Sequence, residues 1–232
     1  MRLIFVTQYD PLDLAAGGPV NKVRALSSHL AARGHSVTII SSRANRRNNY
    51  HNLSNLYEEE PGVTVIRLRA ICRYRSTSIN PWIWPVARRE VKHADLVHLF
   101  GFYDLLGPVA ACVARSHKIP YVIEPIGMLV PIVRSLGKKM LYHRWLGSRL
   151  VAGASRVLAT SPQEKSELLE AGIPSSTIVE RRNGIDLGEF AELPRRGDLR
   201  QRLGIASHER VILYLSRLST KKNPDMLLRV FH

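Results

Sequence analysis

The chain has 232 residues, 45% hydrophobic and 23% charged, and its 34 Lys and Arg against 19 Asp and Glu give a formal charge of +15. This composition is typical of a folded globular protein and excludes long disordered or collagen-like regions. Two cysteines allow neither a disulfide framework nor a cysteine zinc cluster. No apolar run reaches the roughly 18 residues of a membrane helix.

Strand-length apolar runs alternate with helical patterns along the chain. The runs are predominantly apolar and do not alternate with polar residues, which is typical of strands buried on both faces of a parallel sheet. They occupy Leu3–Thr7, Val37–Ser41, Val63–Leu68, Leu96–Phe100, Tyr121–Ile123, Arg156–Ala159, Ile178–Val179 and Val211–Leu215. The pattern predicts an α/β fold with a Rossmann-like parallel sheet and helices on both faces.

Helices are expected between these runs. In the segment 19–33, Val23, Leu26 and Leu30 recur at three- and four-residue spacing, so one helix face can pack on the sheet. Further helices are expected at about 81–93, 103–117, 162–171 and 224–232. Ser161 is expected to cap the helix that starts at Pro162, with Glu164 bonding back to the Ser161 amide.

The segment Asp186–Arg202 lacks a clear period and carries Pro194 and Gly197 among charges, which indicates a connection between domains. A single strand–helix pair follows it, too little to bury both of its faces. We therefore expect a first domain at 1–188, and a linker with the truncated start of a second domain at 189–232.

Gly17 and Gly18 lie between the first strand and the first helix. Glycines let the backbone approach a ligand closely, and the start of a helix presents free N–H groups, so this loop suits a diphosphate or another anion. Ligands of open α/β sheets bind beyond the carboxyl ends of the strands, where this loop falls. The G-x-G-x-x-G spacing of dinucleotide sites is absent, and a flexible turn explains the glycine pair equally well.

Several stretches resemble the family 4 retaining glycosyltransferases in order and spacing. They are Gly17-Gly18-Pro19, Asp95–His98, Ile119–Met128, Asn183–Asp186 and Ser216–Asn223. The resemblance implies a GT-B enzyme, whose two Rossmann-like domains face a cleft. It further implies a nucleotide-sugar donor, retention of the anomeric configuration, and no requirement for a metal or another cofactor.

The resemblance also assigns residues. Gly17 and Gly18 would cradle the donor diphosphate or border the acceptor, and Arg217 and Lys222 would neutralise the diphosphate as it leaves. Fixed cations aimed at a charge that grows in the transition state lower the barrier. Glu124 and Gly127 would belong to the acceptor-facing loop of the first, acceptor-side domain.

The catalytic residue is not identified by the resemblance. Ile126 stands where many relatives have a histidine or an arginine, and an isoleucine can neither transfer a proton nor bond a sugar hydroxyl. His98 and Glu124 are the alternatives. A histidine in an apolar strand is more often a core residue, and Glu124, at a strand end, is expected to face the cleft or to meet an arginine.

These observations favour a cytoplasmic glycosyltransferase that moves a sugar from a nucleotide-diphosphate donor to a glycan or lipid-linked acceptor in polysaccharide or glycolipid biosynthesis. Most donor contacts of the family, including a pair of glutamates, lie beyond position 232, so the chain alone is expected to be inactive. The alternative is a non-catalytic remnant that binds acceptor or membrane. Nucleic acid is an unlikely partner, because the basic clusters lie on several elements and no known nucleic-acid-binding motif accompanies them.

The stretch from 133 to 151 mixes basic and apolar residues, and its candidates for a membrane surface are Arg134, Lys138, Lys139 and Trp145. A helix of this composition can lie on an anionic bilayer with its tryptophan at the interface, which would make the protein peripheral at the inner face of the membrane. A helix packed on the sheet with a solvated basic face is the alternative.

Overall fold

The computed structural model describes residues 1–13, 17–43, 54–74, 77–130, 136–185, 188, 191–216, 218 and 222–231. The chain divides into two compact parts, Met1–Ile185 and Asp186–His232, which we call unit 1 and unit 2.

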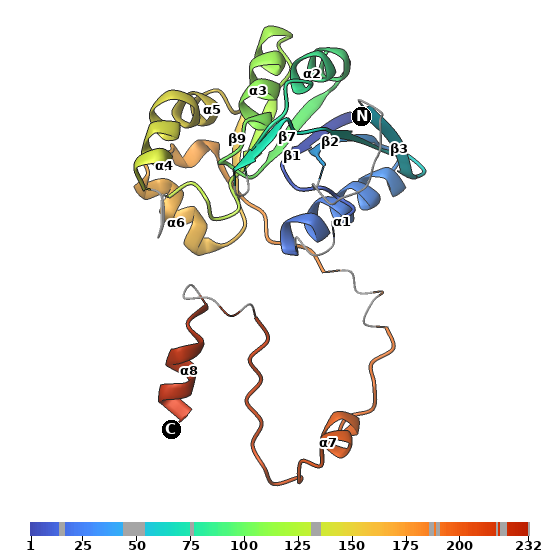
Figure 1. The fold of residues 1–232 in the computed structure, drawn as a ribbon, viewed down its shortest axis with the longest axis vertical. Helices are drawn as coiled ribbons and strands as arrows, with labels where there is room; N and C mark the ends of the chain where they lie inside the picture. The colour runs from blue at the N-terminus through green and yellow to red at the C-terminus, as the bar shows by residue number, and fades with distance from the viewer. Residues whose placement is uncertain are drawn as a thin grey trace. The chain divides into compact units, whose positions relative to one another are not determined.

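Unit 1 contains an eight-stranded sheet in the order β10-β9-β8-β7-β1-β2-β4-β3 (Figure 1). Its strands are β1 (Arg2–Thr7), β2 (Ser36–Ser42), β3 (Ser54–Glu60), β4 (Val63–Leu68), β7 (Leu96–Phe100), β8 (Tyr121–Glu124), β9 (Arg156–Ala159) and β10 (Ile178–Glu180). All pairings are parallel except that of β3, an edge strand antiparallel to β4. Seven of the predicted strands and the predicted α/β class are thereby confirmed.

Helices cover both faces of the sheet, as the sequence predicts (Figure 1). Alternate residues of β1 divide between the two faces: Phe5 joins a cluster that includes Val23 of α1 (Gly18–Ala32), and Ile4 joins the larger cluster on the other face. The larger cluster is covered by α2 (Ile83–Val91), α3 (Leu106–Ser116) and α6 (Pro162–Glu170). Burying both faces explains why the strands are predominantly apolar and do not alternate with polar residues.

The stretch predicted as a basic, apolar helix forms three short helical segments. These are α4 (Leu136–Tyr142), a π-helical turn (His143–Gly147) and α5 (Ser148–Ala152). The ring of Phe102 lies against Gly147, where an added Cβ would come within 2.7 Å of Phe102 Cζ. The close approach therefore requires a glycine in the π-helical turn.

Some elements differ from the sequence-based expectation. The segment Val211–Leu215 forms no strand, because no described segment pairs with it, and its residues are largely exposed. A helix, α7 (Asp198–Leu203), lies in the segment expected to be a connection, whereas α8 (Pro224–Phe231) forms where a helix was expected. The edge strand β3 and the small hairpin β5–β6 (Cys72–Tyr74 and Thr77–Ile79) were not predicted, because short edge strands lack a continuous apolar run.

The order of the strands places a topological switch point between β1 and β7. From β1 the chain proceeds to β2 and β4 on one side, and then returns to β7, β8, β9 and β10 on the other. In open parallel sheets the ligand crevice lies at such a point, beyond the carboxyl ends of the strands. The loops that follow β1, β7 and β8 are therefore the expected place for a site.

Candidate functional site

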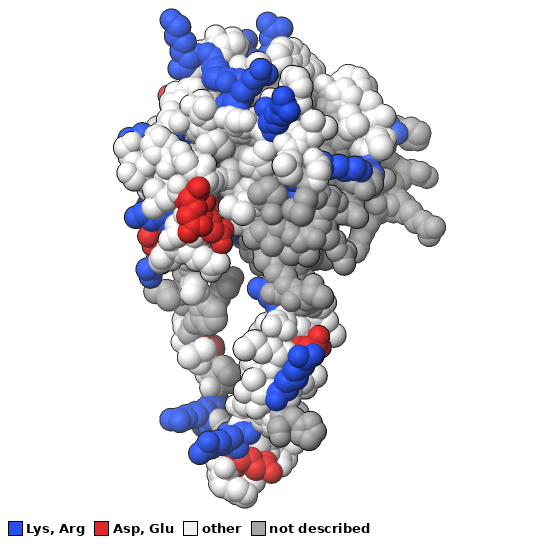
Figure 2. Space-filling model, turned by 90° about the vertical axis from the view of Figure 1, so that its left-hand side faces the viewer, with Lys and Arg blue, Asp and Glu red and all other residues white. Residues whose placement is uncertain are grey.

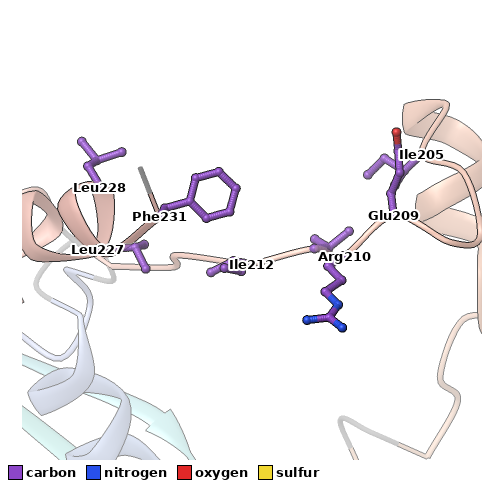
Figure 3. Close-up of a pocket in the computed structure, with 8 residues that line it drawn as sticks. Ile205, Glu209, Arg210, Ile212, Leu227, Leu228 and Phe231 are labelled. Carbon is purple, nitrogen blue, oxygen red and sulfur yellow. The ribbon is translucent and has the colours of Figure 1, made fainter.

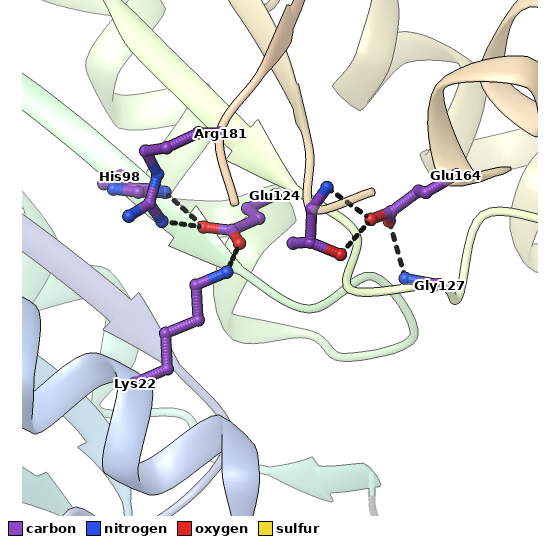
Figure 4. A network of polar contacts seen from close by, with 7 residues as sticks. Lys22, His98, Glu124, Gly127, Glu164 and Arg181 are labelled. Carbon is purple, nitrogen blue, oxygen red and sulfur yellow. Dashed lines mark hydrogen bonds and ion pairs between the residues drawn. The ribbon is translucent and has the colours of Figure 1, made fainter. Parts of the chain in front are cut away.

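The carboxylate of Glu124, at the carboxyl end of β8, is completely buried and binds cations from two other elements (Figure 4). Lys22 of α1 forms an ion pair with its Oε1. Arg181, the first residue after β10, donates a hydrogen bond from Nη2 to its Oε2 at 2.7 Å. Of the two expectations for Glu124, facing the cleft or meeting an arginine, the structure shows the second, in keeping with the need of a buried carboxylate for a paired cation.

His98 of β7 lies beside this carboxylate, with Nε2 3.3 Å from Glu124 Oε2. The imidazole is buried and stacks on Phe100, with ring centroids 3.9 Å apart. Burial, reinforced by the charges of Arg181 and Lys22, holds the pKa of His98 well below its usual value, so the ring is neutral. Among the residues that the structure describes, Nε2 has no hydrogen-bond partner.

Lys22 and Arg181, the two cations that bind Glu124, also have altered pKa values. Burial, followed by the charge of Arg181, lowers the pKa of Lys22 from 10.5 to about 8, while Glu164 acts in the opposite direction. Burial likewise lowers the pKa of Arg181. Its side chain is 32% exposed, against 8% for Lys22. Arg181 is therefore the member of the cluster with the most surface open to a ligand.

The residues after Glu124 form a tight turn in which two successive residues have positive φ, 55° at Ile126 and 64° at Gly127. The Met128 amide donates to the Pro125 carbonyl at 3.2 Å and closes the turn. These φ signs are those of a type I′ turn, which favours Asn and Gly and disfavours a β-branched residue. Packing holds Ile126 there, because its side chain contacts the apolar cluster under α1.

Glu164 of α6 fixes the same turn from the other side. Its carboxylate accepts hydrogen bonds from the Gly127 amide at 2.6 Å, and from the amide and hydroxyl of Thr160 at 2.8 and 2.6 Å (Figure 4). Ser161 caps α6 as predicted, accepting from the Glu164 amide at 3.1 Å. The return bond from Glu164 to the Ser161 amide, however, is replaced by bonds to Thr160 and Gly127, since the side chain reaches past the cap into the site.

The glycine pair opens α1 at the same edge of the sheet. Gly17 is the N-cap residue, with φ 75°, and its carbonyl accepts from the amides of Val20 and Asn21 at 3.0 and 3.3 Å. A Cβ added at Gly17 or at Gly18 would meet no atom of the described residues within 4 Å. Packing therefore does not require glycine here, and open space remains above the first turn of α1.

The remaining predicted site residues are distributed over both units. Lys222 lies in unit 2 and is exposed. Its carbonyl accepts from the Tyr214 hydroxyl at 3.3 Å. Arg217 and Arg134 lie outside the described residues, while Lys138 and Lys139 lie on α4. Trp145 lies in the π-helical turn and is 57% exposed.

Sequence reasoning missed Lys22 and Arg181, the two cations that bind Glu124. Each is far from it in the chain, by 102 and 57 residues. A signal was present nonetheless: Lys22 follows the glycine pair by one helical turn, and Arg181 directly follows β10. Both positions lie at the carboxyl edge of a parallel sheet, where Glu124 was already expected.

A hollow of about 620 Å³ lies in unit 2 between the segment 205–212 and α8 (Figure 3). Its lining is mainly apolar, with Ile212, Leu227 and Phe231 among the side chains. Ligand sites combine such a lining with several convergent polar groups. Here Glu209 and Arg210 are the polar members, and the hollow shares no residue with the cluster around Glu124.

Much of the basic excess lies away from Glu124. Figure 2 shows basic side chains gathered at one end of unit 1. Exposed basic residues lie at and just beyond the C-terminal ends of α2 and α3, namely Arg88, Arg89, Lys92, Arg115 and Lys118. These helix ends lead into the amino ends of β7 and β8, opposite the edge that carries Glu124. The net charge alone therefore does not locate the candidate site.

Two features are absent from the described part of the chain. Its side chains include no group of three or more His, Cys, Asp or Glu placed to hold a metal ion. Its helices include none that is both long and apolar enough to cross a membrane.

Comparison with curated proteins identifies relatives that are named as sugar transferases. The chain is 27% identical over 233 residues to the D-inositol 3-phosphate glycosyltransferase of Kineococcus radiotolerans, covering 92% of this chain and 51% of that protein. The enzyme of the same name from Thermobifida fusca is 30% identical over 229 residues, covering 92% and 51%. The chain thus spans about half the length of the curated relatives it matches.

Solved structures show the same fold. Sucrose-phosphate synthase from Thermosynechococcus elongatus matches with a TM-score of 0.69 at 19% identity, over 99% of this chain and 59% of that one. HepE from Anabaena in complex with UDP-glucose matches with a TM-score of 0.67 at 19% identity, over 100% and 57%. The model of the glycosyl transferase 4-like domain matches residues 17–184, beginning at the glycine pair and ending past Arg181. The chain therefore belongs to the family of glycosyl transferase 4-like proteins.

Proposed function

We propose that unit 1 is the acceptor-side half of a glycosyltransferase. The enzyme would move a sugar from a nucleotide-diphosphate donor to a glycan or lipid-linked acceptor with retention, in polysaccharide or glycolipid biosynthesis at the cytoplasmic side of the membrane. The observation that carries the proposal is the match of the family domain to residues 17–184, the part of the chain that places the glycine pair and the Gly127 turn at one sheet edge.

A nucleotide-sugar donor is supported by what related proteins bind. HepE has been solved with UDP-glucose, and its fold matches the whole of this chain. The free N–H groups at the start of α1 suit the negative charge of a diphosphate. Gly17 and Gly18 would contact the diphosphate or border the acceptor, and Arg217 and Lys222 of unit 2 would neutralise the charge that grows as the diphosphate leaves.

We further propose that the chain by itself binds its donor weakly. Lys222 belongs to unit 2, in which no described residue is buried. A donor pocket needs side chains held in place by packing, because a loosely held cation loses most of its binding energy to ordering. Donor affinity is thus expected to rise when a packed second domain follows unit 1.

Sugar transfer by a fusion protein tests the proposal. Residues 1–185 are joined to the second domain of the Thermobifida fusca relative, and products are followed by mass spectrometry with UDP-, GDP- and ADP-sugars and both acceptor classes. We expect transfer from one donor with an unchanged anomeric configuration. Gly18→Val is the matched variant, because its side chain has space in the fold but fills the approach to α1. Donor binding without transfer to any acceptor, or full transfer by the Gly18→Val variant, would overturn the proposal.

A membrane surface is the second candidate partner. Met140, Leu141 and Trp145 are exposed by 65%, 59% and 57%, and exposed basic residues, Lys138 and Arg144, lie among them. Exposed apolar side chains beside cations suit the interface of an anionic bilayer. Such contact would place unit 1 beside lipid-linked acceptors, and it would serve equally a non-catalytic protein that only binds membrane.

A further inference from the structure

We propose that Glu124 is a positioning residue, which fixes the start of α1, the Gly127 turn and the segment after β10 in one arrangement. The inference rests on the proposed function, because it assigns these three segments to one ligand site. It concerns geometry, however, so part of its test is independent of sugar transfer.

The burial of Glu124 argues against direct contact with a substrate. Its side chain has no exposed surface, and Lys22 and Arg181 both bind its carboxylate. Both carboxylate oxygens are therefore already engaged, and neither is open to a departing group. Glu124 can therefore act only through the residues that it binds.

The two cationic partners of Glu124 come from segments that are distant in sequence and converge in space (Figure 4). Lys22 follows Gly17 and Gly18 by one helical turn, so its ion pair holds the beginning of α1 against β8. Arg181 holds the residues that leave β10, and its own amide also donates to the Ala159 carbonyl at 2.7 Å. Glu124 therefore links the loop after β1 with the chain that leads out of the sheet.

The turn after Glu124 is fastened on both sides. Ile126 packs against the cluster under α1, while the Gly127 amide donates to Glu164 at 2.6 Å. These contacts, with the ion pair of Lys22, leave the turn and the start of α1 little freedom to move apart. Such preorganisation is what a site needs to align two reactants.

Hydrogen exchange on the 232-residue chain tests the geometry without any transferase assay. Glu124→Gln is expected to speed exchange at least tenfold at the amides of Val20, Asn21 and Met128, relative to the strands. Lys22→Arg keeps the charge, so its exchange rates at these amides should stay within threefold of the wild-type rates. Glu90→Gln is the control, because Glu90 pairs with Arg2 at 2.7 Å at the opposite, amino edge of the sheet. Loss of this ion pair should not speed exchange at Val20, Asn21 and Met128 more than elsewhere.

Kinetics of the fusion protein separate positioning from catalysis. Glu124→Gln should raise KM for donor and acceptor about tenfold while kcat stays within threefold, and Lys22→Arg should restore nearly all of the activity that Lys22→Met loses. A kcat that falls a hundredfold with unchanged KM would identify Glu124 as catalytic and overturn the inference. Equal acceleration of exchange in Glu124→Gln and Glu90→Gln would also overturn it, whether or not the fusion protein transfers sugar.

Discussion

At the scale of single residues, Ile126 occupies a backbone conformation that its side chain disfavours. A left-handed residue other than glycine costs about 1–2 kcal/mol. Lys118 has nearly the same φ, 57°, but is exposed at the amino edge of the sheet. The two residues differ in packing, because Ile126 contacts the apolar cluster under α1.

This difference predicts opposite effects of glycine at the two positions. Lys118→Gly should raise the free energy of unfolding by about 0.5–1 kcal/mol, since the relieved strain exceeds the added entropy of the unfolded chain. Ile126→Gly should lower it by about 1 kcal/mol, because lost apolar burial outweighs relieved strain. Urea unfolding measures both. Equal stabilisation by the two variants would show that packing does not hold Ile126 in place.

Asp104, directly before α3, predicts a pH dependence of stability. Burial raises its pKa from 3.8 to about 6, although the amides of Gly107 and Leu106 oppose the shift. The folded state therefore keeps a proton that the unfolded state releases, and the contribution of this group to stability is lost as the pH rises from about 4 to about 6. Asp104→Asn should remove that loss and raise the free energy of unfolding by about 2 kcal/mol at pH 7.

Urea unfolding between pH 4 and pH 7 measures the effect of Asp104→Asn. Glu170→Gln, on the exposed side of α6, is the control and should leave the pH profile unchanged. If wild type and Asp104→Asn lose stability in parallel as the pH rises, Asp104 is not the group responsible.

The polar partners in the site could not be predicted from the sequence, and the reason is physical. Ser161 and Glu164 form a local cap, whose signal lies within four residues. The partners of Glu124 are brought to it by the order of the strands, over 102 and 57 residues. Local patterns thus left open whether Glu124 faces the cleft or meets an arginine, and they did not indicate which cations bind it.

At the scale of elements, buried parallel strands were predictable because they are predominantly apolar and do not alternate with polar residues. The runs at Val63–Leu68 and Leu96–Phe100 match β4 and β7 residue for residue. The run at Val211–Leu215 has the same character, yet forms no strand, because a strand also needs a partner. Composition indicates that a segment can form a strand, whereas pairing decides whether it does.

The helical stretch from α4 to α5 predicts binding to anionic vesicles. The chain should sediment with vesicles that contain phosphatidylglycerol and much less with phosphatidylcholine vesicles. Replacing Leu141 and Trp145 together by serine should weaken binding tenfold or more, because apolar burial at the interface is lost. Trp84→Ser is the matched control, since Trp84 is 46% exposed on α2. Equal binding to both lipids, or no effect of the double variant, would exclude this surface.

At the scale of the whole molecule, the account depends on which edge of the sheet binds ligand. The carboxyl edge carries the glycine pair, the Gly127 turn and the buried cluster of Glu124, whereas the amino edge carries exposed basic residues such as Arg115 and Lys118. Charge alone favours the amino edge for an anionic donor. Fold topology favours the carboxyl edge, where open α/β sheets bind their ligands.

Amide chemical-shift mapping of the ¹⁵N-labelled chain with UDP-glucose as the probe distinguishes these edges directly. We expect saturable shifts at Gly17, Gly18, Lys22 and Gly127, with weak affinity. Shifts confined to the amino edge around Lys118, or no saturable shift at the glycine pair and the turn, would contradict it.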